Sequence, residues 1–365
     1  MEGPAPMTDP GIPDLLESDV EQDLRGTVRT LLEKRASAAD VLRRTESDDP
    51  VDLGLWAALV EMGCAGLAVP EAFGGAGASW REAAVVAEEL GRAVAPVPYL
   101  GHAMAVAALL AVGDEELLPD LASGARTATL AVPFSTMPGT DPVGLASVAD
   151  ARTADVLLVP VGRGAGMELV AVQATAVAIT PVLSLDMTRP LADLAVDAGG
   201  AGRVVARGEA ASAAVAHALR IGAMLLAAEQ VGIADRVLEM TVSYLNERRQ
   251  FGRIIGSYQG LKHRCADLWV TLTQARAVAR YAAVCAATDA ADTAVAVALA
   301  KAFCGPMALR TAEEGVQMHG GIGFTWEHPA HLYLKRAAAD AIALGSADRH
   351  RADLARTADI PGPAA

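Results

Sequence analysis

The chain has few aromatic residues, few cysteines and an excess of acidic over basic residues. Aromatic residues make up 4% of the 365 residues, whereas 52% are hydrophobic, so we expect a core of small aliphatic side chains on helices. Lysine and arginine number 30 against 44 aspartates and glutamates, which gives a net charge of −14. An acidic surface repels phosphate backbones, which excludes nucleic acid as a partner. The binding site of any anionic ligand must therefore contain basic residues of its own.

Several catalytic and targeting patterns are missing from the sequence. No lysine follows a glycine, so there is no P-loop, and neither H-E-x-x-H nor G-x-S-x-G occurs. The N-terminus has no signal-peptide layout, and the apolar stretch 104–112 is shorter than the ~20 residues that span a bilayer. We expect a cytoplasmic protein with no membrane span and no metal site. The four cysteines have no zinc-like spacing and are expected to be buried thiols: Cys64, Cys265, Cys285 and Cys304.

Hydrophobic periodicity divides the chain into three parts. Residues 17–125 have helical spacing of apolar residues around a Gly/Pro-rich loop, and Ser79 with Glu82 predicts a capping box. Short β-branched runs from about residue 127 predict a small antiparallel β domain, with glycine-rich 162–166 as a turn rather than a dinucleotide-binding loop. Further on, helices are predicted over 213–247, 258–287, 291–315 and 330–344.

The fold class that follows is α+β, with three domains. They are an N-terminal helical domain over 1–125, a middle β domain over 126–208 and a C-terminal four-helix domain over 209–365.

The first candidate site is the segment Asn246-Glu-Arg-Arg-Gln-Phe-Gly-Arg-Ile-Ile-Gly-Ser-Tyr-Gln259. On a helix Arg248 and Phe251 share a face, where the guanidinium can donate two N–H groups to a pyrophosphate and the ring can pack on a flat ligand. Gln259 offers an amide at the start of the next helix. A helix C-terminus with favourable basic residues and a glycine stop explains the same pattern equally simply.

The second candidate site is Gln317-Met-His-Gly-Gly-Ile-Gly-Phe-Thr-Trp-Glu-His-Pro329. Paired glycines allow a backbone to approach a phosphate closely, although a glycine turn that only ends a helix looks alike. His319, His328 and His331 have no set of metal-binding partners, so we interpret them as packing or surface histidines.

Together with Tyr258–Leu268 and Leu332–Arg336, these two segments resemble the flavin-contacting segments of the acyl-CoA dehydrogenase family, and the order of helical, β and helical domains resembles the fold of that family. The resemblance covers nearly the whole chain. It implies FAD as cofactor, an acyl-CoA substrate, electron-transfer flavoprotein as acceptor and an oligomer. The flavin contacts that it implies, shared across a subunit boundary, are Arg248, Phe251, Gln259, Gln317 and Gly321.

The chain departs from the family at the catalytic base. The position that carries a glutamate in many members is Leu344, followed by Gly345-Ser346, and the alternative position aligns near Gly222. Neither can accept a proton. The carboxylates nearest in sequence are Glu229, Asp340 and Asp348, of which Glu229 lies two helical turns from Gly222 on roughly the same face.

The β domain also departs from the family. The segment 132–141 matches the strand that covers the flavin in relatives poorly, and no tryptophan occurs between Trp80 and Trp269. The chain resembles the base-less subunit of actinobacterial α2β2 members, some of which act on steroid side chains. It is expected to work in fatty acid or steroid side-chain oxidation beside a paralogous subunit that supplies the glutamate. The alternatives are a self-sufficient dehydrogenase with Glu229 as base, alone or as a homo-oligomer, and a non-catalytic structural partner.

Overall fold

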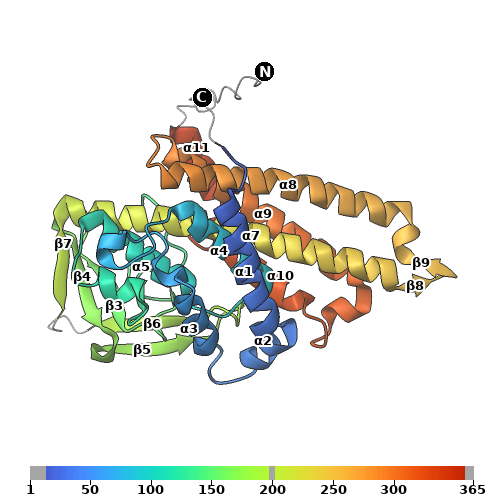
Figure 1. Ribbon diagram of the computed structural model, residues 1–365, viewed down its shortest axis with the longest axis horizontal. Helices are drawn as coiled ribbons and strands as arrows, with labels where there is room; N and C mark the ends of the chain where they lie inside the picture. The colour runs from blue at the N-terminus through green and yellow to red at the C-terminus, as the bar shows by residue number, and fades with distance from the viewer. Residues whose placement is uncertain (1–13, 197–201, 358–365) are drawn as a thin grey trace, which may run out of the picture.

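The computed structural model describes residues 14–196 and 202–357. Within this part of the chain, helices flank a middle β region, as the sequence predicts (Figure 1). The helices are α1 (Asp19–Arg35), α2 (Ala38–Thr45), α3 (Leu53–Glu61), α4 (Trp80–Ala93), α5 (Tyr99–Val112), α6 (Leu118–Ala122), α7 (Gly208–Glu247), α8 (Gln259–Ala287), α9 (Thr293–His319), α10 (Ala330–Ile342) and α11 (Ala347–Thr357).

The β region consists of two small sheets that pack on each other. The strands are β1 (Ala128–Leu130), β2 (Val148–Ala149), β3 (Val156–Val161), β4 (Glu168–Gln173), β5 (Val177–Val182), β6 (Leu191–Val196) and β7 (Arg203–Arg207). One sheet has the order β1-β3-β4-β7 and the other β2-β6-β5. The prediction of an antiparallel domain is wrong for β1, which pairs with β3 in parallel. These two strands are not joined by a hairpin, since β2 lies between them in the chain and belongs to the other sheet.

Local signals explain where several helices begin. Ser79 and Glu82 form the predicted capping box at the start of α4, and Ser18 with Glu21 forms another at α1. Helix α5 follows Pro98, which has no side-chain cap to offer. Its Gly101 amide instead donates 2.9 Å to a carboxylate oxygen of Asp150, which therefore caps α5 from the β region.

Helix α7 is the central element of the molecule. It is 40 residues long and packs against α4 and α5 on one side and α8 and α9 on the other. Its contact with α4 is close, because a Cβ on Gly232 would lie 1.8 Å from the carbonyl oxygen of Glu88. Helices α7 and α9 are long and apolar enough to cross a membrane, but more than half of each apolar window is buried inside the protein. Both are core helices of this fold.

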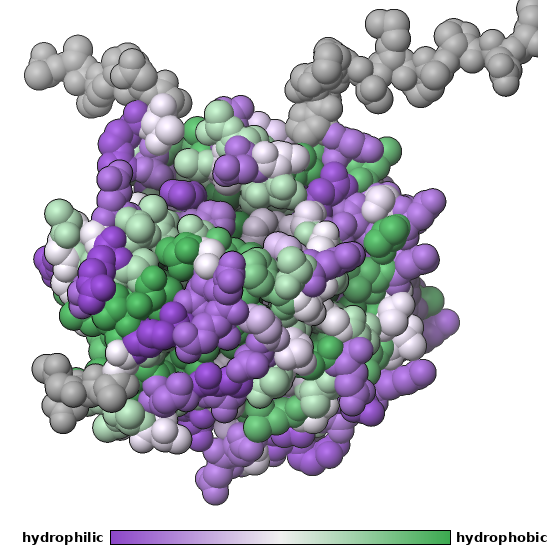
Figure 2. All heavy atoms as spheres, turned by 60° about the vertical axis from the view of Figure 1, so that its left-hand side comes forward, coloured by the Kyte–Doolittle hydropathy of each residue, from purple (hydrophilic) through white to green (hydrophobic). Residues whose placement is uncertain are grey.

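The end of α7 lies far from the β domain. A small hairpin, β8 (Arg249–Gln250) and β9 (Arg253–Ile254), projects there beside the start of α8 (Figure 1). On the face shown in Figure 2, toward the β-domain side, hydrophilic side chains separate small hydrophobic patches. At the opposite end, around the β8–β9 hairpin, several of the exposed apolar residues are aromatic: Phe251, Phe324 and Trp326.

Candidate functional site

The hairpin after α7 displays Phe251 at its tip. Phe251 and Gly252 both have positive φ, 51° and 77°, as a two-residue type I′ turn requires. Glycine adopts this conformation freely, whereas a phenylalanine is strained in it. The Phe251 side chain is 90% exposed and gains no packing energy that offsets the strain within the subunit. A strained, exposed aromatic residue at a defined turn indicates a functional contact outside this chain.

Basic and amide groups surround this hairpin. Arg248 is exposed and caps α7, while Arg249 and Arg253 are exposed on the two strands. The guanidinium of Arg253 lies 3.8 Å from the ring centroid of Tyr258, which holds the hairpin against the start of α8. Gln259 is exposed at the first position of α8. In a chain of net charge −14, this is a local basic surface at a helix start.

The second predicted segment ends α9 and continues into the 3₁₀ turn Gly320–Phe324. Gln317 and Gly321 are both exposed. A Cβ added to Gly321 would have no atom within 4 Å, so packing within this subunit does not require glycine there. The open space allows a ligand or a partner to approach the backbone at Gly321 closely.

The two segments lie at the same end of the molecule. The rings of Tyr244, at the end of α7, and His319, at the end of α9, have centroids 4.7 Å apart. Around them, large apolar side chains are exposed in the 3₁₀ turn and just after it, besides Phe251: Ile322, Phe324 and Trp326. An exposed aromatic surface beside three arginines and an unobstructed Gly321 fits a ligand with aromatic rings and a pyrophosphate, which is the chemistry of FAD.

The structure around Leu344, the position that the resemblance assigns to the base, differs from the sequence prediction. Helix α10 ends at Ile342 instead of 344, because the backbone of Ala343 is extended and that of Leu344 is left-handed, with φ 52°. Its amide donates 2.8 Å to the Phe134 carbonyl oxygen, and its own carbonyl accepts from His350 Nε2 at 2.9 Å. The Leu344 side chain is fully buried. A strained backbone is therefore held in place at a position whose side chain has no proton to exchange.

Gly222 and Leu344, the two positions that the resemblance assigns to the base, face each other in this structure. A Cβ on Gly222 would lie 3.0 Å from Leu344 Cδ1 and 2.6 Å from Met104 Sδ. Leu344 and Met104 thus occupy the space that a longer side chain at residue 222 would need. The small cavity that remains lies between α5, β1 and Leu344, and no carboxylate is among the described residues that line it.

Glu229, the candidate for a relocated base, is bound in a buried ion-pair network. Its carboxylate is 2.6 Å from Arg189 and 3.2 Å from Arg336. Burial alone would raise the pKa of Glu229, but the two guanidinium groups outweigh burial and the pKa is lowered. A carboxylate held charged between two arginines is a poor proton acceptor.

The other two carboxylates are also placed away from a base role. Asp340 is fully buried and bonds Arg189 at 2.7 Å. Burial and the charge of Glu229 raise the pKa of Asp340 to about 8. Asp348 is exposed on α11, where it pairs with Arg351.

Sequence reasoning missed Arg189, Arg336 and Asp150, because no local pattern marks residues whose partners are far along the chain. Arg189 is 40 residues from Glu229 and 151 from Asp340. No spacing in the sequence signals these contacts.

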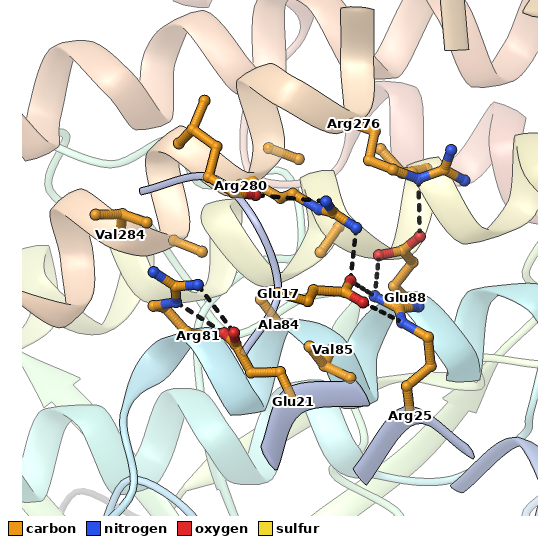
Figure 3. Close-up of a pocket in the computed structure, with 15 residues that line it drawn as sticks. Glu17, Glu21, Arg25, Arg81, Ala84, Val85, Glu88, Arg276, Arg280 and Val284 are labelled. Carbon is orange, nitrogen blue, oxygen red and sulfur yellow. Dashed lines mark hydrogen bonds and ion pairs between the residues drawn. The ribbon is translucent and has the colours of Figure 1, made fainter. Parts of the chain in front are cut away.

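A second cavity lies between α1, α4 and α8 (Figure 3). Its rim is charged, but its carboxylates are neutralised by arginines within the chain. Arg25 contacts both Glu17 and Glu88, and Arg280 contacts Glu17 as well. This network ties α1 to α4 and α8 and offers no free base.

The metal prediction stays a prediction: among residues 14–196 and 202–357 no group of three or more His, Cys, Asp or Glu residues is arranged to hold a metal ion. The four cysteines are free; Cys265 is half-buried and the other three are buried.

The order of helical, β and helical regions is that of a flavin-dependent dehydrogenase, and the family comparison agrees. Residues 18–125 match the acyl-CoA dehydrogenase N-terminal domain, and residues 212–358 match the acyl-CoA dehydrogenase C-terminal domain. The chain belongs to the acyl-CoA dehydrogenase family, whose members are FAD-dependent oxidoreductases.

Several relatives are similar to this chain over most of its length. It is 39% identical to acyl-CoA dehydrogenase IpdE2 of Mycolicibacterium smegmatis over 329 residues, 90% of this chain and 95% of that protein. Among solved structures, a variant of the Tcur3481-Tcur3483 steroid ACAD has a TM-score of 0.82 at 30% identity, covering 93% of this chain and 98% of the other. The ChsE4-ChsE5 complex of Mycobacterium tuberculosis has a TM-score of 0.84 at 26% identity, covering 96% and 100%.

Proposed function

We propose that this chain is the FAD-binding, base-less subunit of a two-component acyl-CoA dehydrogenase, and that a paralogous subunit supplies the catalytic carboxylate. The observation that carries the proposal is the pairing of Leu344 with Gly222 and Met104. Both family positions for the base converge on one apolar, closed space, while the surface around Phe251 remains exposed and basic.

Each residue of the end surface has a role in this proposal. Arg248 donates to the FAD pyrophosphate and Phe251 packs against its rings across the subunit boundary, while Gln259 and Gln317 donate amide hydrogen bonds. Gly321 leaves its amide free to approach the phosphates. Bound FAD supplies the acceptor for two electrons in the α,β-dehydrogenation of an acyl-CoA thioester.

The relatives support the assembly and the substrate class that we propose. One similar structure is a steroid ACAD and another is a complex of two different chains, so we assign a steroid-derived acyl-CoA and an α2β2 heterotetramer to this protein. Electron-transfer flavoprotein is the proposed acceptor, in the cytoplasm. The partner chain then holds the substrate and its α-proton against its own glutamate.

The ion pairs of Glu229 argue against the self-sufficient alternative. A base must reach the substrate Cα, yet Glu229 is 5% exposed and is not among the residues that line the cavity beside Leu344. Converting it into a base requires breaking its contacts with both Arg189 and Arg336.

A visible spectrum tests the proposal. The purified chain is compared alone and co-expressed with a base-bearing acyl-CoA dehydrogenase from the same genome. We expect flavin absorbance in the complex, at about one FAD per pair of subunits, and bleaching by an acyl-CoA only there. A yellow chain that an acyl-CoA bleaches without a partner would contradict the proposal, and a colourless complex would favour a structural subunit.

A further inference from the structure

Three histidines support the turn that carries Gly321. His319 is the last residue of α9 and is 3% exposed. Its ring lies between Tyr244, at 4.7 Å, and His328, at 4.3 Å between centroids. His331, in the first turn of α10, contacts Trp326 at 4.7 Å. The rings are tilted by 30° and 46° to one another, and a Cβ on Gly323 in the turn would lie 3.1 Å from His319 Cβ, so the turn packs on this cluster. We call the three rings the histidine stack: Tyr244, His319 and His328.

Hydrogen-bond geometry favours the neutral form of both histidines. His319 Nδ1 lies 2.7 Å from the Gly315 carbonyl oxygen, so this nitrogen carries a hydrogen, and in the neutral ring Nε2 carries none. That Nε2 is buried and has no partner among the residues that the structure describes. His328 Nδ1 accepts from the Ala330 amide at 3.3 Å, so it carries no hydrogen.

A proton added to either ring is incompatible with the stack. On His319 Nε2 it would be a buried donor without an acceptor, and on His328 Nδ1 it would face the Ala330 N–H. Two imidazolium rings would also repel each other at 4.3 Å. Charging the stack must therefore separate the rings and release the turn that they support.

The surroundings do not supply a buried counter-charge. Arg264 on α8 pairs with Glu314 on α9, and Lys335 on α10 lies over Trp326. The residue of α7 that contacts His319 is Tyr244, which is uncharged. From α8, Cys265 contacts Met318, the neighbour of His319 in the chain. The remaining carboxylates near the ends of these elements are exposed: Glu247, Glu313 and Glu327.

The pKa values of the three histidines are all lowered. Burial lowers the pKa of His319; burial and then the neighbouring histidines lower the pKa of His328; burial and then Lys335 lower the pKa of His331. A histidine whose pKa is lowered in the ordered state stabilises that state above its ordinary pKa of about 6.5. This stabilisation is lost as the pH falls below that value.

We propose that His319 and His328 are positioning residues of the flavin site, and that the histidine stack makes FAD retention depend on pH. The neutral stack holds Gly320–Phe324 in place for the phosphates, and acidification opens it. The inference rests on the proposed function, because it takes Gly321 as a contact of FAD.

The test measures the FAD dissociation constant of the complex between pH 8 and 5.5. In the wild type it rises below about pH 6.5, by up to tenfold per pH unit for each proton taken up. In His319→Phe/His328→Phe the rings remain but cannot be charged, so the constant stays flat. The milder His328→Phe reduces the slope if the double variant folds poorly.

A matched control is His217→Phe. His217 is also largely buried with its pKa lowered by burial, but it lies 27 residues before Tyr244 on α7, about 40 Å away at 1.5 Å per residue. This variant retains the wild-type pH dependence. A constant that does not rise in acid, or a double variant that follows the wild type, overturns the inference.

Hydrogen exchange of residues 320–328 without FAD separates this inference from the proposed function. Wild-type protection, corrected for intrinsic rates, falls below about pH 6.5, whereas the double variant stays protected. Loop opening in a protein that never binds FAD would overturn the assignment of the flavin site and with it the role of the stack in binding. FAD binding with a loop that stays closed in acid would overturn the stack alone.

Discussion

At the scale of single residues, the molecule contains two positions with a strained backbone, and they differ in burial. Phe251 and Leu344 both have a left-handed backbone, but Phe251 is exposed and Leu344 is buried. No packing within the subunit offsets the strain at Phe251, whose side chain is exposed. At Leu344 the Phe134 carbonyl and His350 hold the strained backbone, although the side chain has no proton to exchange.

Phe251→Asn tests the first position. Asparagine adopts a left-handed backbone readily, so the free energy of unfolding stays the same or rises by up to about 1 kcal/mol. FAD retention falls, because the exposed ring is lost. Thermal unfolding and flavin absorbance of the complex measure the two effects, and unchanged flavin content would show that Phe251 is not a flavin contact.

Leu344→Glu tests the second position. The carboxylate would enter an apolar space beside Met104 with no partner, so the variant is destabilised by about 3 kcal/mol or more and gains no activity alone. Leu344→Met, which conserves volume, costs less than about 1.5 kcal/mol and serves as control. Acyl-CoA dehydrogenation by the isolated glutamate variant would mean that its acyl site is open.

At the scale of elements, helix packing depends on a few close approaches. Gly232→Ala would place a Cβ 1.8 Å from the backbone oxygen of Glu88 and push α7 away from α4. We expect a loss of about 3 kcal/mol or more in the free energy of unfolding. Gly26→Ala, exposed in α1 with no atom within 4 Å, should instead stabilise by about 1 kcal/mol. Denaturant unfolding distinguishes them; equal effects would contradict this packing account.

The elements were largely predictable and the site only in part. Helical periodicity predicted α7 to α10 to within five residues at each end, and Ser79 with Glu82 predicted the start of α4, because these signals are local. The parallel pairing of β1 with β3 was not predictable, since it depends on the path of the chain between them. The convergence of Gly222, Leu344 and Met104 is a long-range contact that no sequence spacing shows.

At the scale of the whole molecule, a buried ion-pair network joins the β domain to the helices. Arg189 comes from the connection between β5 and β6 and binds Glu229 on α7 and Asp340 on α10. Its guanidinium also lies 5.4 Å from the ring centroid of Phe134. The network fixes the β domain in relation to the position of Leu344.

Arg189→Ala should therefore cost about 3–5 kcal/mol, because it leaves two buried carboxylates without this partner. Arg207→Ala removes an exposed arginine that pairs with Glu168 and should cost less than about 1 kcal/mol. Chemical denaturation of both variants measures the difference, and a mild effect of Arg189→Ala would mean that water solvates the network.

The most direct test of a shared site is the flavin content of the two-subunit complex with Arg248→Ala in this chain alone. The account predicts that FAD is lost although the partner keeps its glutamate, while Arg207→Ala, at the β-domain end, leaves FAD in place. Gel filtration confirms that the complex stays assembled. An assembled Arg248→Ala complex with its full complement of FAD and wild-type activity would contradict the claim that this chain holds flavin for a base on its partner.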